Sequence, residues 1–349
     1  MLIKIKRGWE LPESAATPES LFHTRRRLLQ GLATGPALLA AGAFLGGCDD
    51  GAADASATGP AKGGRQTKSL ANGFRDPTAD LYPVKRNPRY TVARSISPEA
   101  LATAYNNFYE FASNKDVVAR ARKLPIRPWQ VRIDGMVEKA QTIDIDALIR
   151  RMPLEERVYR FRCVEAWAMT VPWSGFPMKA LVDLARPLSA AKYVRMESFF
   201  LPEVSSSQRA GFGYPWPYVE GLTMAEATNE MTLLVTGVYG KPVPPQNGAP
   251  LRLITPWKYG FKSVKSLVKF TFTDKRPISM WEQIQSREYG FWANVNPAVP
   301  HPRWSQAEER LLGSGLPGLW ERVPTRIWNG YGAFVADMYK DLKGEKLFM

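Results

Sequence analysis

Cys163 is the residue whose type and setting most clearly suggest chemistry. Residues 157–162 alternate aromatic side chains with arginine and valine, a pattern that predicts a strand ending at this thiol. Arg160 and Arg162 would share one face of that strand, and positive charge beside a thiol favours the thiolate. Because a thiolate binds soft or high-valent metals, Cys163 is a candidate metal ligand. An inert, buried cysteine is the alternative.

Histidine and cysteine are otherwise scarce, which excludes several common kinds of active site. The chain has two of each, and His23 and Cys48 lie near its N-terminus. A His-Glu-x-x-His zinc site and a Cys-x-x-Cys-His haem site are both absent. The spacing of the four residues also argues against a structural zinc site. A Ser-His-Asp or Cys-His centre could use only His301 or His23, and a reductase that forms a disulfide would have only Cys48 as its second thiol.

A basic cluster follows a stiff, proline-rich segment at residues 241–250. Arg252, Lys258, Lys262 and Lys265 lie close together in the sequence. The phosphate-binding pattern Gly-x-x-x-x-Gly-Lys-Ser/Thr is missing, but lysine, arginine and backbone N–H groups could still hold a phosphate. A solvated basic edge strand is the alternative.

Residues 106–111 mix polar and aromatic side chains. Asn106 and Tyr109 are three residues apart and would share one face of a helix. An ordinary amphipathic helix end shows the same pattern, so these residues alone assign no function.

The net charge of +14 lies in the body of the chain. Residues 1–55 carry six basic and six acidic side chains, which cancel, so the excess belongs to residues 56–349. A basic body attracts anions such as nucleic acid, membrane headgroups, an acidic partner or a phosphorylated cofactor. Solubility alone is the alternative explanation.

The N-terminal 55 residues are predicted to be an export signal. Residues 24–30, Thr-Arg-Arg-Arg-Leu-Leu-Gln, fit the twin-arginine pattern, and a mildly apolar, glycine-rich run follows at 31–47. We therefore expect export of the folded protein to the periplasm by the twin-arginine pathway. A short anchor helix is the alternative. Cleavage could occur at Ala53-Asp54-Ala55, or before Cys48, which would then carry a lipid.

Residues 56–85 read as a linker and an extended arm, and residues 86–349 as one globular unit without internal repeats. A helix with Ser97 as its N-cap is predicted to run to about Phe111. Thr223 and Glu226 form a candidate capping box. Further helices are predicted at 144–151, 177–185 and 332–346, and strands at 130–133, 157–162, 193–201, 231–236, 250–254 and 264–273.

These elements do not alternate regularly between strand and helix, so we expect an α+β fold of mixed sheets with short helices. A Gly-x-Gly-x-x-Gly sequence after a strand is also missing, which argues against a nicotinamide dehydrogenase.

From about Arg86 onward, the chain resembles the molybdopterin-containing catalytic subunits of bacterial periplasmic protein-methionine-sulfoxide reductases. The resemblance implies a sulfite-oxidase-like, molybdopterin-binding fold. Four ordered stretches carry it: 106–111 (NNFYEF), 162–167 (RCVEAW), 244–250 (PPQNGAP) and 257–262 (WKYGFK).

The resemblance also implies a set of site residues. Cys163 would be the catalytic residue and the protein ligand of molybdenum in a molybdenum–molybdopterin cofactor. Ser198 stands where relatives have threonine, and the hydroxyl is kept. The implied cofactor-binding residues are Asn106, Tyr109, Glu110, Ser198, Asn247, Arg252, Ser263, Val264 and Lys265.

The implied reaction reduces methionine sulfoxide, free or in oxidised periplasmic proteins, by oxygen-atom transfer to the Cys-ligated molybdenum–pterin centre. Because the chain has no haem or flavin motif, electrons would come from a membrane haem b subunit fed by the quinone pool. We expect a monomeric catalytic subunit within a heterodimer, since no room for a sulfite-oxidase dimerisation domain remains after Met349, and no nucleic-acid partner. A sulfite dehydrogenase is the nearer alternative, and a basic binding module without activity is the more distant one.

Overall fold

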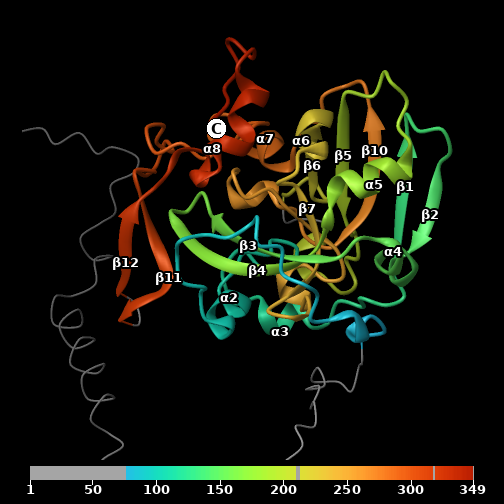
Figure 1. Cartoon of the computed structure of the whole chain (residues 1–349), viewed down its shortest axis with the longest axis horizontal. Helices are drawn as coiled ribbons and strands as arrows, with labels where there is room; N and C mark the ends of the chain where they lie inside the picture. Colours follow the sequence, from blue (N-terminus) through green and yellow to red (C-terminus); the bar gives the residue numbers. More distant parts are fainter. Residues whose placement is uncertain (1–75, 210–212, 317–318, 349) are drawn as a thin grey trace, which may run out of the picture. The chain divides into compact units, whose positions relative to one another are not determined.

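A computed structural model describes residues 76–209, 213–316 and 319–348 (Figure 1), all of which belong to one compact unit. The predicted signal at 1–55 lies outside the described residues, as does most of the predicted linker. Among the helices of the described ranges, none combines the length and apolar character that a membrane span requires.

A five-stranded mixed sheet has the order β2-β1-β10-β5-β6. β1 and β10 run parallel, and the other neighbours are antiparallel. Its strands are β1 (Gln130–Gly135), β2 (Gln141–Asp144), β5 (Tyr193–Ser198), β6 (Val219–Thr223) and β10 (Leu267–Thr273).

A second sheet of seven strands has the path β12-β11-β4-β7-β8, with β3 paired to β4 and β9 paired to β7. Residues 156–162 of β3 are all buried, as are residues 167–176 of β4, so both strands are covered on two faces. The strands are β3 (Glu155–Arg162), β4 (Trp167–Pro177), β7 (Leu233–Val238), β8 (Lys241–Pro242), β9 (Arg252–Ile254), β11 (Glu308–Leu316) and β12 (Leu319–Pro324).

The helices are short. The α-helices are α2 (Glu99–Ala104), α3 (Val118–Ala121), α4 (Ile145–Arg151), α5 (Met178–Ala185), α6 (Met224–Thr228), α7 (Met280–Gln285) and α8 (Gly332–Val335). The 3-10 turns are η3 (Ala79–Leu81), η4 (Ser206–Gln208), η5 (Pro245–Asn247), η6 (Gly260–Lys262), η7 (Ile327–Gly330) and η8 (Ala336–Tyr339). One cluster of buried apolar side chains connects the two sheets. The predicted α+β class with mixed sheets and short helices is confirmed.

The predicted helix from Ser97 to about Phe111 is wrong in its length and its cap. α2 ends at Ala104 because Tyr105 turns into extended backbone. The N-cap is Pro98, and the Ser97 hydroxyl instead accepts a hydrogen bond from the Thr170 N–H at 3.1 Å. Tertiary packing overrides helix propensity here, since Phe108 is buried in the core beyond the helix end.

Several other predicted bounds also differ. The closing helix ends at Val335 and continues as the turn η8, where Tyr339 is buried and receives a hydrogen bond from Trp257. β5 ends at Ser198 instead of residue 201, and β10 begins at Leu267 instead of residue 264. The residues removed from these two strands form loops beside the site described below.

The predicted capping box of α6 is confirmed. The Glu226 N–H donates to the Thr223 hydroxyl at 3.2 Å, and the Thr223 N–H donates to the Glu226 carboxylate at 2.9 Å. Glu226 also accepts hydrogen bonds from Lys258 and Tyr339, and these contacts connect the N-terminus of α6 to the core.

Thr223→Ala is expected to lower the free energy of unfolding by about 1 kcal/mol, because one N-terminal N–H of α6 loses its acceptor. Urea denaturation would measure the change. Ser189→Ala, at an exposed position, is the control and should leave stability unchanged. Equal stability of the two variants would contradict the role of the cap.

Candidate active site

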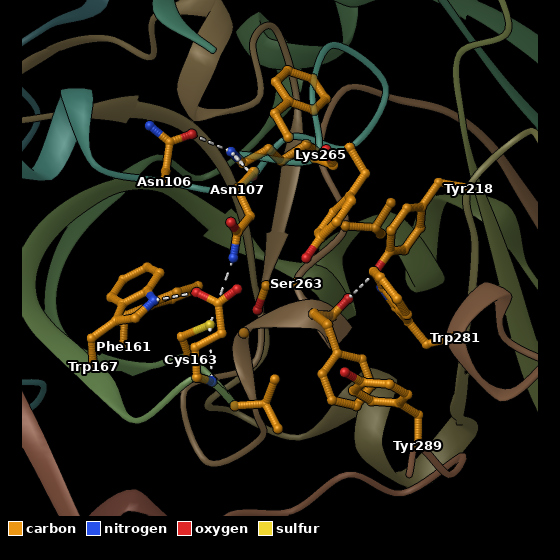
Figure 2. A pocket seen from close by; sticks show the side chains of 18 of the residues that line it. Asn106, Asn107, Phe161, Cys163, Trp167, Tyr218, Ser263, Lys265, Trp281 and Tyr289 are labelled. Carbon is orange, nitrogen blue, oxygen red and sulfur yellow. Dashed lines mark hydrogen bonds between the residues drawn. The ribbon is translucent and has the colours of Figure 1, made fainter. Parts of the chain in front are cut away.

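Four loops converge on a cavity of about 490 Å³ (Figure 2). They are the segment after α2, the turn between β3 and β4, the segment from η5 into β9, and the segment from η6 into β10. Nine of the ten predicted site residues line this cavity, and only Ser198 does not. The volume suits a small-molecule or cofactor site.

Cys163 occupies the turn that joins β3 to β4. Its N–H donates to the Trp167 carbonyl at 2.9 Å, and Ala166 takes positive φ to close the turn. The thiol is 5% exposed and is the free cysteine of the described residues. The Glu165 N–H lies 3.5 Å from Sγ, and the Asn107 side-chain amide lies 3.8 Å from it.

The positive charge of Arg162 favours the Cys163 thiolate, as expected, but burial outweighs its effect on the pKa of the thiol. Arg162 forms a buried ion pair with Glu309 at 3.1 Å, and Arg160 donates to the Asn329 carbonyl at 3.2 Å. Burial, together with the nearby Glu165 carboxylate, raises the pKa of the Cys163 thiol to about 12. Burial therefore favours the neutral thiol, and a bound metal cation would favour the thiolate instead.

A polar network that the sequence did not reveal surrounds the thiol. Lys115 Nζ lies 2.5 Å from the Glu165 carboxylate and donates to the Asn107 side-chain oxygen at 2.6 Å. The Trp167 indole N–H donates to Glu165 at 2.9 Å. Asn107, Glu165 and Trp167 stand inside the stretches matched by resemblance, but Lys115 stands outside them and carried no signal.

Two cations, the buried Arg252 and the partly buried Lys265, line the cavity without a carboxylate partner among the described residues. Arg252 donates to the carbonyls of Asn247 at 2.8 Å and Ser263 at 3.1 Å. Lys265 Nζ donates to the Asn106 side chain at 2.6 Å and to two carbonyls. Among the described residues, neither Arg252 nor Lys265 forms an ion pair. Burial lowers the pKa of Arg252 to about 9 and that of Lys265 well below its usual range.

The other two lysines of the basic cluster do not belong to the site. Lys258 is paired with Glu226 at 2.5 Å, and Lys262 with Glu220 at 2.6 Å. All four of these side chains are buried, and neither lysine lines the cavity. The predicted phosphate role is therefore wrong for these two lysines, and the alternative of a solvated basic edge is wrong as well. Spacing in the sequence could not distinguish paired lysines from unpaired ones.

Gly248 permits the two unpaired cations to pack beside the turn. Its φ is +103°, and a Cβ there would lie 2.9 Å from Lys265 Cγ and 3.0 Å from Arg252 Cβ. A larger residue would therefore force the two cationic side chains away from the turn.

Glu110 lines the cavity, where burial raises its pKa to about 7. Ser198 stands at the end of β5, outside the cavity lining, and its buried hydroxyl has no hydrogen-bond partner among the described residues. Tyr109 lines the cavity, and burial raises the pKa of its hydroxyl.

An aromatic wall faces Cys163 across the cavity, and the sequence did not predict it. Figure 2 shows Tyr218, Trp281 and Tyr289 on the side away from Cys163, Phe161 and Trp167. The Trp281 ring centroid lies 4.8 Å from that of Tyr109 and 5.0 Å from that of Tyr289. Trp281 and Tyr289 belong to α7 and the segment after it, whereas Tyr109 and Tyr218 come from distant segments, so no local spacing relates the four residues.

The cavity fits the molybdenum–molybdopterin cofactor. The Cys163 thiol offers a soft metal ligand, and Arg252 and Lys265, which have no carboxylate partner among the described residues, offer positive charge to an anion such as a phosphate. Asn107 links Lys265 to the thiol, because its carbonyl accepts from Lys265 while its amide approaches Cys163 Sγ. The side-chain oxygen of Asn247, which lines the cavity, is buried without a protein donor and could accept a hydrogen bond from a pterin.

Residues 119–281 match the family of the oxidoreductase molybdopterin binding domain. The protein-methionine-sulfoxide reductase catalytic subunit MsrP of Burkholderia mallei (strain ATCC 23344) is 44% identical over 346 residues, which are 98% of this chain and 96% of that protein. Among solved structures, the sulfane dehydrogenase SoxCD from Paracoccus pantotrophus is similar, with a TM-score of 0.42 and 15% identity over 74% of this chain and 67% of that one.

The match to the curated relative extends over nearly the whole sequence, the N-terminal segment included. It confirms the predicted family and enzyme class, and with the matched domain it confirms the predicted molybdenum–molybdopterin cofactor. The chain therefore belongs to the family of the protein-methionine-sulfoxide reductase catalytic subunits.

Proposed function

We propose that this protein reduces methionine sulfoxide, in oxidised proteins or free, to methionine, with Cys163 as the protein ligand of molybdenum. One observation carries the proposal: a single cavity is lined by a buried thiol, a buried arginine and a partly buried lysine, and neither cation has a carboxylate partner among the described residues. The bound molybdenum centre supplies two-electron redox chemistry and oxygen-atom transfer.

Residues of the chain bind the cofactor, surround the sulfur with polar groups and contact the substrate. Arg252 and Lys265 neutralise and orient the cofactor phosphate, with the backbone of Ser263 and Val264 beside them. Asn107 and Glu165 hold polar groups against the sulfur. The aromatic wall excludes water and offers faces against which the substrate's sulfur and methyl groups can pack.

Metal and pterin analysis of the exported protein, together with assays on methionine sulfoxide and on sulfite, tests this function. We expect stoichiometric molybdenum and pterin, and reduction of methionine sulfoxide by a chemical electron donor. Sulfite oxidation without sulfoxide reduction would assign the protein to the sulfite dehydrogenases instead. A folded, cofactor-matured protein without molybdenum would overturn the proposal.

We also propose that the protein works in the periplasm, with a membrane haem b subunit as its electron donor. The twin-arginine pattern at 24–30 supports export after folding, which suits an enzyme whose cofactor must be inserted first. The lack of haem and flavin motifs in the sequence supports an outside donor. Reduction of the purified protein by membranes with and without quinol would test the donor.

Replacing Arg25 and Arg26 together by lysine is expected to keep the precursor in the cytoplasm, because a receptor reads the guanidinium pair and a lysine ammonium lacks its planar, bidentate geometry. Immunoblots of periplasmic and cytoplasmic fractions measure the effect. Lys4→Arg with Lys6→Arg, which adds guanidinium groups outside the motif, is the control. A normal periplasmic level of the double lysine variant would contradict the predicted pathway.

A further inference from the structure

A second hollow, of about 580 Å³, adjoins the catalytic cavity. Glu165 and Trp304 line both spaces, so the two hollows meet at these side chains. The second hollow is built from the turn between β3 and β4, the segment that leads into β11, and Arg322 of β12.

The boundary between the two hollows is firmly held. The Trp304 ring stacks on His301 with a centroid distance of 3.8 Å and an angle of 7°, and its indole N–H donates to the Val164 carbonyl at 2.8 Å. Lys115 and Trp167 fix the Glu165 carboxylate. A ligand that enters the catalytic cavity therefore meets a preformed neighbouring space, which lowers the entropic cost of occupying both.

Arg310 gives the second hollow an uncompensated positive charge. Its guanidinium donates to the Glu165 backbone carbonyl at 3.3 Å, and it forms no ion pair within the described ranges. The hollow's glutamates do have cationic partners, in the pairs Glu165–Lys115, Glu308–Arg322, Glu309–Arg162 and Glu309–Arg94. The free charge is half-buried, where a carboxylate partner is worth more than at an open surface.

We propose that the second hollow binds the polypeptide flanking an oxidised methionine, and that Arg310 favours an acidic residue there. This inference rests on the proposed function. A sulfoxide that is part of a protein sits on a side chain, so the main chain must continue past the mouth of the catalytic cavity, at about 3.3 Å per residue. The hollow beyond Glu165 and Trp304 lies within reach of the first flanking residues, and a free amino acid would leave it empty.

Two short peptides test the proposal, each with one methionine sulfoxide flanked on both sides by aspartate or by lysine. We expect kcat/KM to be about three- to five-fold higher for the aspartate peptide, the range of a partly exposed ion pair. Arg310→Gln should bring this ratio close to one, and Arg310→Lys should retain most of it. Turnover of free methionine sulfoxide is the reference for every variant.

Ala307→Phe supplies a steric test, because this exposed residue lines the hollow and donates no side-chain hydrogen bond. It should lower kcat/KM for both peptides relative to the free amino acid. Arg132 is an exposed arginine of β1, and Arg132→Gln is the control for loss of surface charge. It should change neither the aspartate-to-lysine ratio of kcat/KM nor the ratio between the peptides and the free amino acid.

Fluorescence anisotropy with labelled methionine-sulfone peptides, which cannot be reduced, separates this inference from the proposed function. If the wild type prefers the aspartate peptide and Arg310→Gln loses that preference, peptide binding in the second hollow is supported even when no sulfoxide is reduced. In that case only the proposed reaction fails. The inference is overturned if the preference is missing in the wild type or survives in Arg310→Gln, or if turnover of free methionine sulfoxide falls as much as turnover of the peptides.

Discussion

Cys163→Ser is expected to abolish sulfoxide reduction while the protein still folds. A serine hydroxyl is close in size to the thiol, so the packing loss should stay within about 0.5–3 kcal/mol. The chemical change is much larger, because a neutral hydroxyl is a far poorer ligand than a thiolate for a soft or high-valent metal. The backbone hydrogen bond from Cys163 to Trp167 does not depend on the side chain, so the turn should persist.

Activity, molybdenum content and pterin content of the purified variant measure the effect, with circular dichroism as the folding control. Pterin can stay bound, because Arg252 and Lys265 are contributed by other segments of the chain. Ser113→Ala, a change of another side chain on the cavity wall, is the matched control and should keep substantial activity. Reduction of methionine sulfoxide at a near wild-type rate by a folded Cys163→Ser protein would remove Cys163 as the ligand.

Arg252→Ala is expected to lower the molybdenum and pterin content sharply when the cofactor is limiting. A charge-assisted hydrogen bond contributes about 1.5–3 kcal/mol, which corresponds to a loss of roughly 10- to 150-fold in cofactor affinity. Lys265→Met should act in the same direction, because it removes the second cation without an ion-pair partner. Cofactor content per folded protein, measured after expression with restricted molybdate, gives the result.

Both variants also remove buried hydrogen bonds, so unfolding curves must accompany the cofactor analysis. Arg252 donates to the carbonyls of Asn247 and Ser263, and their loss should lower stability. Lys269→Met is the control, because this lysine of β10 is partly exposed and pairs with Asp134 and Glu197 outside the cavity. Full cofactor occupancy of folded Arg252→Ala at limiting supply would contradict the phosphate role.

The sequence was sufficient for the features that depend on local chemistry. The strand before Cys163, the capping box of α6 and the short helices α4 and α5 all appear near the predicted bounds. The fold class followed from the irregular order of strands and helices. The resemblance carried by four short stretches pointed to ten site residues, and nine of them meet in one cavity.

Tertiary structure decided which charges are paired, because pairing depends on residues far apart in the sequence. Lys258, Lys262 and Lys265 look alike along the chain, but Glu226 and Glu220 neutralise the first two and leave the third unpaired. Arg162 stands next to Cys163 in the sequence, but it forms an ion pair with Glu309, 147 positions away.

The same reason explains the parts of the site that the sequence could not reveal. Lys115 reaches Glu165 across 50 positions, and Trp304 closes the cavity from 140 positions beyond Val164. Residues 105–111 leave the predicted helix because burial of Phe108 and Phe111 in the core outweighs a few tenths of a kcal/mol per residue of helix propensity. Local sequence thus set the strand end that presents the thiol, whereas long-range packing set the charge and the walls of the cavity around it.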